Sequence, residues 1–264
     1  LLGATAGRTT LNGEGLQHED GHSHLLSATI PNCISYDPCF SYELAVIIQN
    51  GLERMIKNQE DVFYYITIMN ENYTHPEMPK NINEDIIKGI YKYSENKAKG
   101  PKVQLMGSGV ILREVIEAAN ILEKDFNVSS SIFSVTSFTE VRRNALDIQR
   151  WNMLNPDKTE KKSTLDEIIV DLESPIITAT DYMKSFAEQI ATFLPNKFIS
   201  LGTDGFGRSD SREALRDFFE VDRNHIVIAA LKALTEKQEI DKSVLLSAIK
   251  KYKIMNDKPN PVSL

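Results

Sequence analysis

The fold class follows from the segment VQLMGSGVILREVIEAANIL, residues 103–122. Its opening run VQLM is short and apolar and ends at Gly107-Ser108-Gly109, which is typical of a buried strand followed by a tight turn. Beyond the turn, apolar residues recur at steps of three and four and predict a helix with one apolar stripe: Leu112, Val115, Ile116, Ala119 and Leu122. The segment is thus predicted to be one strand–turn–helix unit of an α/β protein.

The same alternation continues toward the C-terminus. Short apolar runs predict strands at 131–136, 176–180 and 198–202. Helical periodicity predicts helices at 142–151, around Phe186, Ile190 and Phe193, and at 211–219, 227–238 and 241–251. Strands that alternate with amphipathic helices imply a mostly parallel sheet that is buried on both faces.

The N-terminal third has a less complete pattern. Strands are predicted at 30–36, 62–69 and 89–93, and Asp37-Pro38 predicts a helix start with Asp as the cap. The apolar face of that helix is expected to hold Leu44, Ile47, Ile48, Leu52 and Met55. The polar segment SENKAKGPK, 94–102, is the candidate linker to the second region. Two or three strands are too few to bury both faces of a parallel sheet, so we expect the chain to be the C-terminal part of a longer protein.

The composition excludes several classes of protein. The chain has 264 residues, of which 41% are hydrophobic and 25% charged, so it can bury a large core. Its 30 basic and 37 acidic side chains give a net charge of −7, which argues against nucleic-acid and membrane-surface partners. Two cysteines, Cys33 and Cys39, are too few for a disulfide framework and fit no common zinc spacing. Without an apolar run of ~20 residues or a signal-peptide pattern, a cytoplasmic protein is predicted.

Residues 8–24 form a loop that lacks helical or strand periodicity and holds His18, His22 and His24. Its segment HEDGH, 18–22, matches the H-E-x-x-H signature of zinc proteases, which binds metal only when it lies on a helix. Asp20 and Gly21 are poor helix formers, and on a helix His24 would point about 200° away from His22. Zinc hydrolysis is therefore the weakest alternative, and no metal ligand is predicted in the chain.

Two interpretations of this loop stay open on its chemistry alone. Clustered imidazoles and carboxylates can tune one imidazole across neutral pH for proton transfer. The same groups can instead hold a polar loop together through hydrogen bonds between histidines and carboxylates.

Two glycine-rich turns also have alternatives. Gly107-Ser108-Gly109 could hold a phosphate at a helix N-terminus, but position 112 is leucine rather than the last glycine of G-x-G-x-x-G, so a tight turn is favoured. The segment LGTDGFGRSDSR, 201–212, follows a strand end, where open α/β sheets form clefts. It is interpreted as a glycine turn in which Ser209 or Asp210 caps the next helix, and a role at an interface is left open.

Several longer motifs together carry a family resemblance that covers essentially the whole chain. The loop GRTTLNGEGLQHEDGHSH, 7–24, closely resembles the homodimeric-type bacterial pyruvate dehydrogenases, the thiamine-diphosphate component of the pyruvate dehydrogenase complex. The similarity continues in collinear order through IPNCISYDP (30–38), GLERM (51–55), MNENY (69–73), SVTSFTE (134–140), RWNML (150–154), ATDYMK (179–184) and LGTDGFGRSDSR (201–212).

The resemblance implies a transketolase-like α/β architecture in two parts. Residues 1–95 would be the C-terminal part of the middle, pyrimidine-binding domain, and residues 96–264 the transketolase C-terminal-type domain with its mostly parallel sheet. The family's diphosphate-and-magnesium motif and the glutamate that activates the aminopyrimidine do not occur here, and the resemblance places both upstream of Leu1. Gly202-Thr203-Asp204-Gly205 lies in the C-terminal part and is not that motif.

The resemblance also implies a reaction and site residues. The family decarboxylates pyruvate on thiamine diphosphate and then reductively acetylates the lipoyl group of the acyltransferase component. By its place in the motif, His18 would be the catalytic histidine that gives a proton to the pyruvate oxygen or to the leaving lipoyl sulfur. Supporting residues that set its tautomer and the loop's shape would come from the same segment: Glu14, Glu19, His22 and His24.

Cofactors and partners follow from the same resemblance. Thiamine diphosphate and Mg²⁺ would bind the full-length enzyme, and neither is expected on this chain alone, which is predicted to be inactive. Its partners would be a second copy of itself, as a homodimer, and the dihydrolipoyl acetyltransferase with its lipoyl domain. The alternative is a non-catalytic module that dimerises or assembles a thiamine-diphosphate enzyme.

Overall fold

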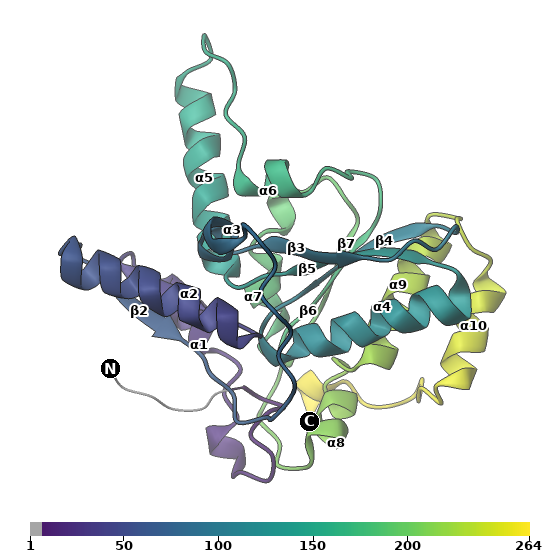
Figure 1. Ribbon diagram of the computed structural model, residues 1–264. Helices are drawn as coiled ribbons and strands as arrows, with labels where there is room; N and C mark the ends of the chain where they lie inside the picture. The colour runs from purple at the N-terminus through teal and green to yellow at the C-terminus, as the bar shows by residue number, and fades with distance from the viewer. Residues whose placement is uncertain (1–6) are drawn as a thin grey trace.

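The computed structural model describes residues 7–264, whose strands form two sheets (Figure 1). The smaller sheet pairs β1 (Cys33–Tyr36) with β2 (Phe63–Ile66) in parallel. The larger sheet has the order β3-β5-β4-β6-β7, with β3 (Tyr91–Glu95), β5 (Ser129–Ser134), β4 (Lys102–Gly107), β6 (Ile176–Ala179) and β7 (Phe198–Leu201). Of the strands in the described part of the chain, only β3 runs antiparallel to its neighbour. The predicted α/β class with a mostly parallel sheet is confirmed.

Helices cover both faces of the larger sheet (Figure 1). Along β4, Leu105 points into one core and the next residue, Met106, into the other, as alternating strand residues must. The first core is closed by α4 (Leu112–Phe126), α8 (Arg212–Phe218), α9 (Arg223–Glu236) and α10 (Lys242–Lys251), and the second by α5 (Phe138–Leu154), α6 (Thr164–Ile168) and α7 (Lys184–Glu188). Within residues 7–264, no helix combines the length and the apolar character that crossing a bilayer requires.

The glycine turn after β4 is a packing turn, as predicted. A Cβ on Gly107 would lie 2.7 Å from the Cα of Leu112, so only glycine lets α4 begin this close to the strand. Gly109 has φ +49°, and a Cβ there would lie 2.5 Å from a carboxylate oxygen of Asp37. The Gly109 amide donates to the Asp37 carbonyl at 2.9 Å and the Ser108 hydroxyl donates to the Asp37 carboxyl at 2.8 Å, so these donors of the turn already have partners and the alternative of a phosphate site is not supported.

The first region packs around the two-stranded sheet. α2 (Ser41–Leu52) continues into one π-helical turn, η2 (Glu53–Lys57), and α3 (Asn83–Lys88) lies beside α2. Of the predicted apolar face of α2, Ile47 is fully buried, whereas Ile48 and Leu52 are 37% and 55% exposed. The smaller sheet therefore leaves part of this helix uncovered within the described chain.

Three predictions about the first region need correction. Asp37 does not cap a helix: α2 starts four residues later, at Ser41, and the Glu43 carboxylate accepts hydrogen bonds from the Cys39 and Phe40 amides at 2.6 and 2.9 Å. The strand predicted at 89–93 is β3, which joins the larger sheet as its antiparallel edge and reaches into the predicted linker. The loop before β1 also contains short helices that its composition does not reveal: η1 (Leu16–His18) and α1 (Ser23–Ala28).

Other elements differ mainly in length. The helix predicted around Phe186 and Phe193 is two short pieces, α7 and the 3₁₀ turn η4 (Ala191–Phe193). The short helices α3 and α6 were not predicted from periodicity, since each has fewer than two full turns. The division of the chain into domains at residue 95 stays a prediction, and the larger sheet already begins at Tyr91.

Candidate functional site

The histidine-rich loop is fixed to the ends of β6 and β7. Asp181 follows β6 and accepts hydrogen bonds from the Thr9 amide at 3.0 Å, the Thr9 hydroxyl at 2.5 Å and the Thr10 hydroxyl at 2.7 Å. Further along the loop, the Met183 amide donates to the Gly21 carbonyl at 3.0 Å. The loop thus lies at the carboxyl end of the larger sheet, where open α/β proteins place their ligands.

His18, the predicted catalytic residue, is the last residue of η1 and is exposed. Its amide donates to the Gly15 carbonyl and its own carbonyl accepts from the Asp20 amide, both at 2.9 Å. The imidazole makes no hydrogen bond with any side chain or main-chain group of residues 7–264. The backbone at His18 is therefore fixed while its ring faces outward.

The other predicted supporting residues differ in exposure, and two of them lie on the protein surface with His18. Glu14 is exposed on the same loop. His22 is exposed, and its Nδ1 lies 3.4 Å from Nη2 of Arg8. Neither side chain makes a hydrogen bond to His18 within the described part of the chain.

Glu19 follows His18 directly but is buried, with 3% of its surface exposed. Neither carboxylate oxygen has a hydrogen-bond partner among the residues described. Burial, with smaller contributions from the carboxylates of Asp181 and Glu14, raises the pKa of Glu19 to about 7. The side chain can therefore hold or release a proton near neutral pH.

His24 lies in the core and not beside His18. Its Nε2 is 2.9 Å from the Thr67 hydroxyl, and its ring stacks on Phe186 at 4.6 Å with the Tyr182 ring edge-on at 4.6 Å. Burial lowers the pKa of His24 to about 3, so the ring stays neutral. In the structure His24 contributes packing and a hydrogen bond to β2's end, because three aromatic rings surround it.

A buried chain of hydroxyls and one carboxyl joins the two sheets. Asp37 accepts from the Thr67 hydroxyl at 2.7 Å and from the Ser108 hydroxyl at 2.8 Å, and Ser108 lies 3.0 Å from the Thr180 hydroxyl. Each of the four residues directly follows a strand: Asp37 follows β1, Thr67 follows β2, Ser108 follows β4 and Thr180 follows β6. Burial raises the pKa of Asp37 to about 7, although the two hydroxyls lower it in part.

Arg8 is a second buried charge that sequence reasoning missed. Only 2% of it is exposed, and its Nη1 donates to the carbonyls of Thr203, at 2.7 Å, and of Gly205. Its Nε donates to the Glu19 carbonyl at 3.1 Å. The guanidinium thus connects the histidine loop to the segment after β7.

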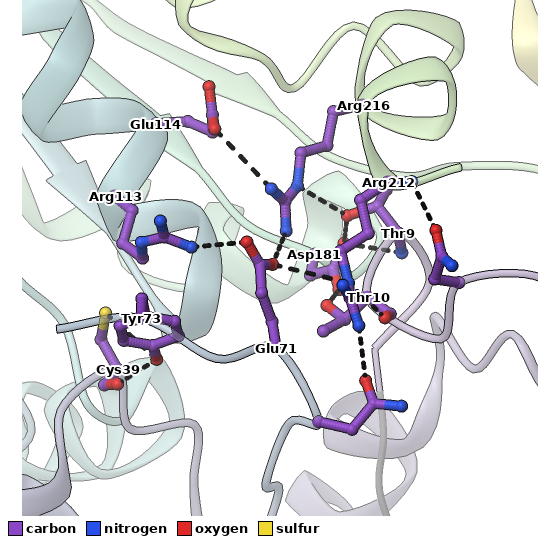
Figure 2. Close-up of polar contacts among 12 residues, drawn as sticks. Thr9, Thr10, Cys39, Glu71, Tyr73, Arg113, Glu114, Asp181, Arg212 and Arg216 are labelled. Atoms are coloured by element: carbon purple, nitrogen blue, oxygen red, sulfur yellow. Dashed lines mark hydrogen bonds and ion pairs between the residues drawn. The ribbon is translucent and has the colours of Figure 1, made fainter. Parts of the chain in front are cut away.

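Figure 2 shows the network of charges beside this loop, centred on Glu71. One Glu71 oxygen accepts from Arg113 and the other from Arg216, each at 2.5 Å. Burial opposes ionisation of Glu71, but the hydrogen bonds and charges of the two arginines outweigh it and lower the pKa of this carboxyl. Arg216 also lies 3.4 Å from the Thr9 hydroxyl, and Arg212 donates to the Thr10 carbonyl at 2.9 Å.

Two features of the sequence could have identified these residues: a place inside a motif of the family resemblance and a place directly after a strand. Arg8 and Asp181 lie inside motifs of the family resemblance, and Asp37 and Asp181 each follow a strand. Their partners lie up to 197 residues away along the chain, so periodicity could not identify them.

Metal-binding potential does not coincide with the histidine loop. η1 ends at His18, so His18 and His22 do not share a helix as the zinc signature requires. Within residues 7–264, the only grouped candidates are Asp217, Asp222 and His225. Asp222 caps α9: its carboxylate accepts from the His225 amide at 2.9 Å and lies 2.8 Å from Nδ1 of the His225 ring, so the helix cap accounts for the closeness of these two residues.

Comparison with known proteins gives consistent results along the chain. Residues 1–76 match the family described as pyruvate dehydrogenase E1 component middle domain, and residues 89–222 match the transketolase-like TK C-terminal domain. The chain is 57% identical over 263 residues to the pyruvate dehydrogenase E1 component of Escherichia coli K12, which covers 99% of this chain and 29% of that protein. For the Cupriavidus necator protein of the same name, identity is 55% over 266 residues. The chain spans about 30% of the length of these curated relatives.

Solved structures support the fold. The transketolase of Pichia stipitis in complex with fructose 6-phosphate has a TM-score of 0.65 at 16% identity, covering 89% of this chain and 30% of that one. The Leishmania mexicana transketolase has a TM-score of 0.63, also at 16% identity, covering 90% of this chain and 30% of that one. At this identity the likeness concerns the transketolase fold alone.

Proposed function

This chain belongs to the family of the pyruvate dehydrogenase E1 component, and we propose that it supplies the proton-transferring histidine of that enzyme's active site. The full reaction would be decarboxylation of pyruvate followed by reductive acetylation of a lipoyl group on the acyltransferase. The observation that carries the proposal is His18, an exposed imidazole on a backbone fixed by hydrogen bonds.

His18 would act as a general acid toward substrate atoms. An imidazole can give a proton to the pyruvate carbonyl oxygen as it becomes a hydroxyl, or to a leaving lipoyl sulfur. Its ring makes no hydrogen bond within residues 7–264, so it is available to substrate. Because the η1 backbone is already fixed, the ring loses less conformational entropy when substrate binds. This smaller entropic cost is how positioning increases the rate.

Glu19, Glu14 and His22 would support this proton transfer. The buried Glu19 carboxyl, whose pKa is near 7, can hold a proton behind the His18 backbone. Glu14 and His22 are exposed on the same loop and can contact polar groups of a bound substrate. His24 has no part in this proposal, because its ring is enclosed by aromatic side chains.

The residues present fit one side of a thiamine-diphosphate site. When bound, thiamine diphosphate supplies the electron sink for decarboxylation. His18 and Glu19 suit the proton-handling side of that chemistry, whereas within residues 7–264 no set of ligands for Mg²⁺ gathers around them. We therefore propose that the diphosphate and its Mg²⁺ are held by parts of the enzyme other than this chain, and that the chain alone is inactive.

The proposal extends to partners. A homodimer in the cytoplasm, with the dihydrolipoyl acetyltransferase and its lipoyl domain as partner, fits the family. The alternative, a module for dimerisation or assembly only, is favoured by the exposed apolar side chains of α2, η2 and β2: Ile48, Leu52, Ile56 and Phe63.

Substitution of His18 tests the main proposal. In the enzyme at the full length of its relatives, His18→Ala should lower kcat for overall acetyl transfer by about 100-fold or more, as expected for loss of a general acid. The melting temperature should stay near that of the unsubstituted enzyme because the ring is exposed. His75→Ala, an exposed histidine on the loop after β2, is the matched control and should keep its turnover. Unchanged turnover in His18→Ala would remove the assignment.

Binding of thiamine diphosphate separates the proposal from the assembly module. Calorimetric titration should give tight binding to the full-length enzyme with Mg²⁺ and none to residues 1–264 alone. Tight binding to the chain alone would contradict the proposed division of the site.

A further inference from the structure

We propose that Arg8 is the positioning residue for His18, a proposal that rests on the function proposed above. Arg8 does not reach the exposed face of His18. It holds the loop from behind, at the residue that follows His18 and at His22, and it ties both to the segment after β7.

The contacts of Arg8 are arranged around the histidine turn. Nε donates to the carbonyl of Glu19, the residue whose amide closes η1 onto Leu16 at 3.3 Å. Nη2 lies 3.4 Å from Nδ1 of His22. On the opposite side, Nη1 donates to the carbonyls of Thr203 and Gly205. One planar group thus fixes both ends of the 19–22 segment relative to a different part of the fold.

This arrangement requires an arginine. A guanidinium presents five N–H donors in a rigid plane, whereas a lysine ammonium is a single point with three rotatable donors. Gly21 makes room for the plane, since a Cβ there would lie 2.5 Å from the guanidinium carbon. The Phe219 ring is 5.7 Å from the same carbon and adds a cation–π contact.

The backbone of Arg8 is itself held by the larger sheet. Its neighbours Thr9 and Thr10 are bonded to Asp181 at the end of β6. Thr203 follows β7 and its hydroxyl donates to the Asp181 carbonyl at 2.9 Å. The position of the histidine turn is therefore set by the ends of two adjacent strands, with Arg8 as the link between them and the turn.

The test uses Arg8→Lys and Arg8→Met in the full-length enzyme. Arg8→Lys should lower kcat by about tenfold or more, because a small displacement of a reacting group has effects of that size. KM for pyruvate should change by less than about threefold, since the shortest hydrogen bonds of Arg8 go to main-chain carbonyls and none goes to the His18 ring. Arg8→Met, without charge, should show the larger loss of kcat.

Arg143→Lys is the matched control. Arg143 also donates to main-chain carbonyls, those of Cys33 at 2.8 Å and Ile30 at 2.9 Å, but these belong to the first residue of β1 and to the turn before it, outside the histidine loop. The kcat of Arg143→Lys should stay close to that of the unsubstituted enzyme.

Hydrogen exchange measured by mass spectrometry supplies a readout that does not depend on turnover. In Arg8→Lys, exchange should rise in peptides covering residues 14–24 and stay unchanged in peptides from β4 and β5. A uniform rise along the whole chain would assign Arg8 a general stabilising role and overturn the proposal.

The outcomes distinguish the two proposals. If His18→Ala is impaired while Arg8→Lys turns over normally, the inference about Arg8 is wrong and the proposed function stands. If His18→Ala turns over normally, the proposed function fails first. If Arg8→Met does not fold, Arg8→Lys alone decides, because it retains the charge and most of the side-chain volume.

Discussion

Asp37 shows how burial changes the chemistry of a single residue. Its carboxyl is fully buried between the two sheets, and among residues 7–264 the groups that donate hydrogen bonds to it are the hydroxyls of Thr67 and Ser108. Two neutral donors do not replace the hydration that a carboxylate loses, so burial raises its pKa from 3.8 to about 7. The residue therefore links the stability of the fold to pH.

We predict that Asp37→Asn flattens the dependence of stability on pH. The folded protein binds this proton more tightly than the unfolded chain, so the contribution of Asp37 is fully present below pH 3.8 and is lost as the pH rises through about 7. At about 1.4 kcal/mol per pKa unit, the loss is on the order of 4 kcal/mol. Asparagine does not ionise, so Asp37→Asn should remove most of this decline of the unfolding free energy. Urea unfolding at several pH values between 4 and 7 measures it.

The control for this prediction is Asp157→Asn on the exposed loop after α5. Asp157→Asn should show the same decline of the unfolding free energy with pH as the unsubstituted protein. Glu19, whose pKa is also near 7, contributes in the same direction, so a residual slope is expected in Asp37→Asn. An identical slope in Asp37→Asn and in the unsubstituted protein would show that Asp37 is not the titrating group.

At the scale of elements, α2 is held by one buried carboxylate. Glu43 accepts from the Cys39 and Phe40 amides, which begins the helix, and from the hydroxyls of Tyr91 and Ser134 at 2.6 Å each. The last two residues belong to β3 and β5, so the same side chain that caps α2 also joins it to the larger sheet.

Glu43→Ala should lower the free energy of unfolding by on the order of 3 kcal/mol or more, since it leaves several buried donors without acceptors. Glu43→Gln should cost less, because the two hydroxyls can turn and accept from the new amide group. The control, Glu53→Ala, removes an exposed pair with Lys57 and should change stability by less than about 0.5 kcal/mol. Chemical denaturation measures all three, and equal effects of Glu43→Ala and Glu53→Ala would refute this role.

At the scale of the whole molecule, Glu71 connects segments from three regions. It follows β2, and its arginine partners lie on α4 and α8, next to the loop that carries His18 (Figure 2). The side chains of Glu71 and Arg216 are 13% and 8% exposed, so this pair is shielded from solvent far better than a surface ion pair.

A double-mutant cycle with Glu71→Gln and Arg216→Met measures this connection. We expect a coupling free energy of about 1–3 kcal/mol, typical of contacting groups within one buried network. The same cycle on Glu53 and Lys57, whose side chains are 51% and 74% exposed, should give about 0.3–0.5 kcal/mol. Equal coupling in the two cycles would show that the Glu71 network does not hold the regions together.

The sequence by itself determined the class of fold and most of its elements. The spacing of apolar residues predicted the strand–turn–helix unit at 103–122 and the strands β5, β6 and β7, because periodicity records which face of an element is buried. Motifs of the family resemblance identified the histidine loop and the family of the chain. Helices of one turn or two were missed, since so few residues carry no periodic signal.

Only the tertiary structure decided which polar groups meet. Asp37 looked like a helix cap because Asp-Pro is a good local start signal, yet the carboxyl is used between two sheets. His18 and His24 belong to one motif but point to solvent and to an aromatic core. Arg8 finds its acceptors 195 and 197 residues away. A buried polar group needs a hydrogen-bond partner, and the tertiary fold decides which groups lie close enough to serve. Because those partners are far apart in the sequence, local patterns do not predict them.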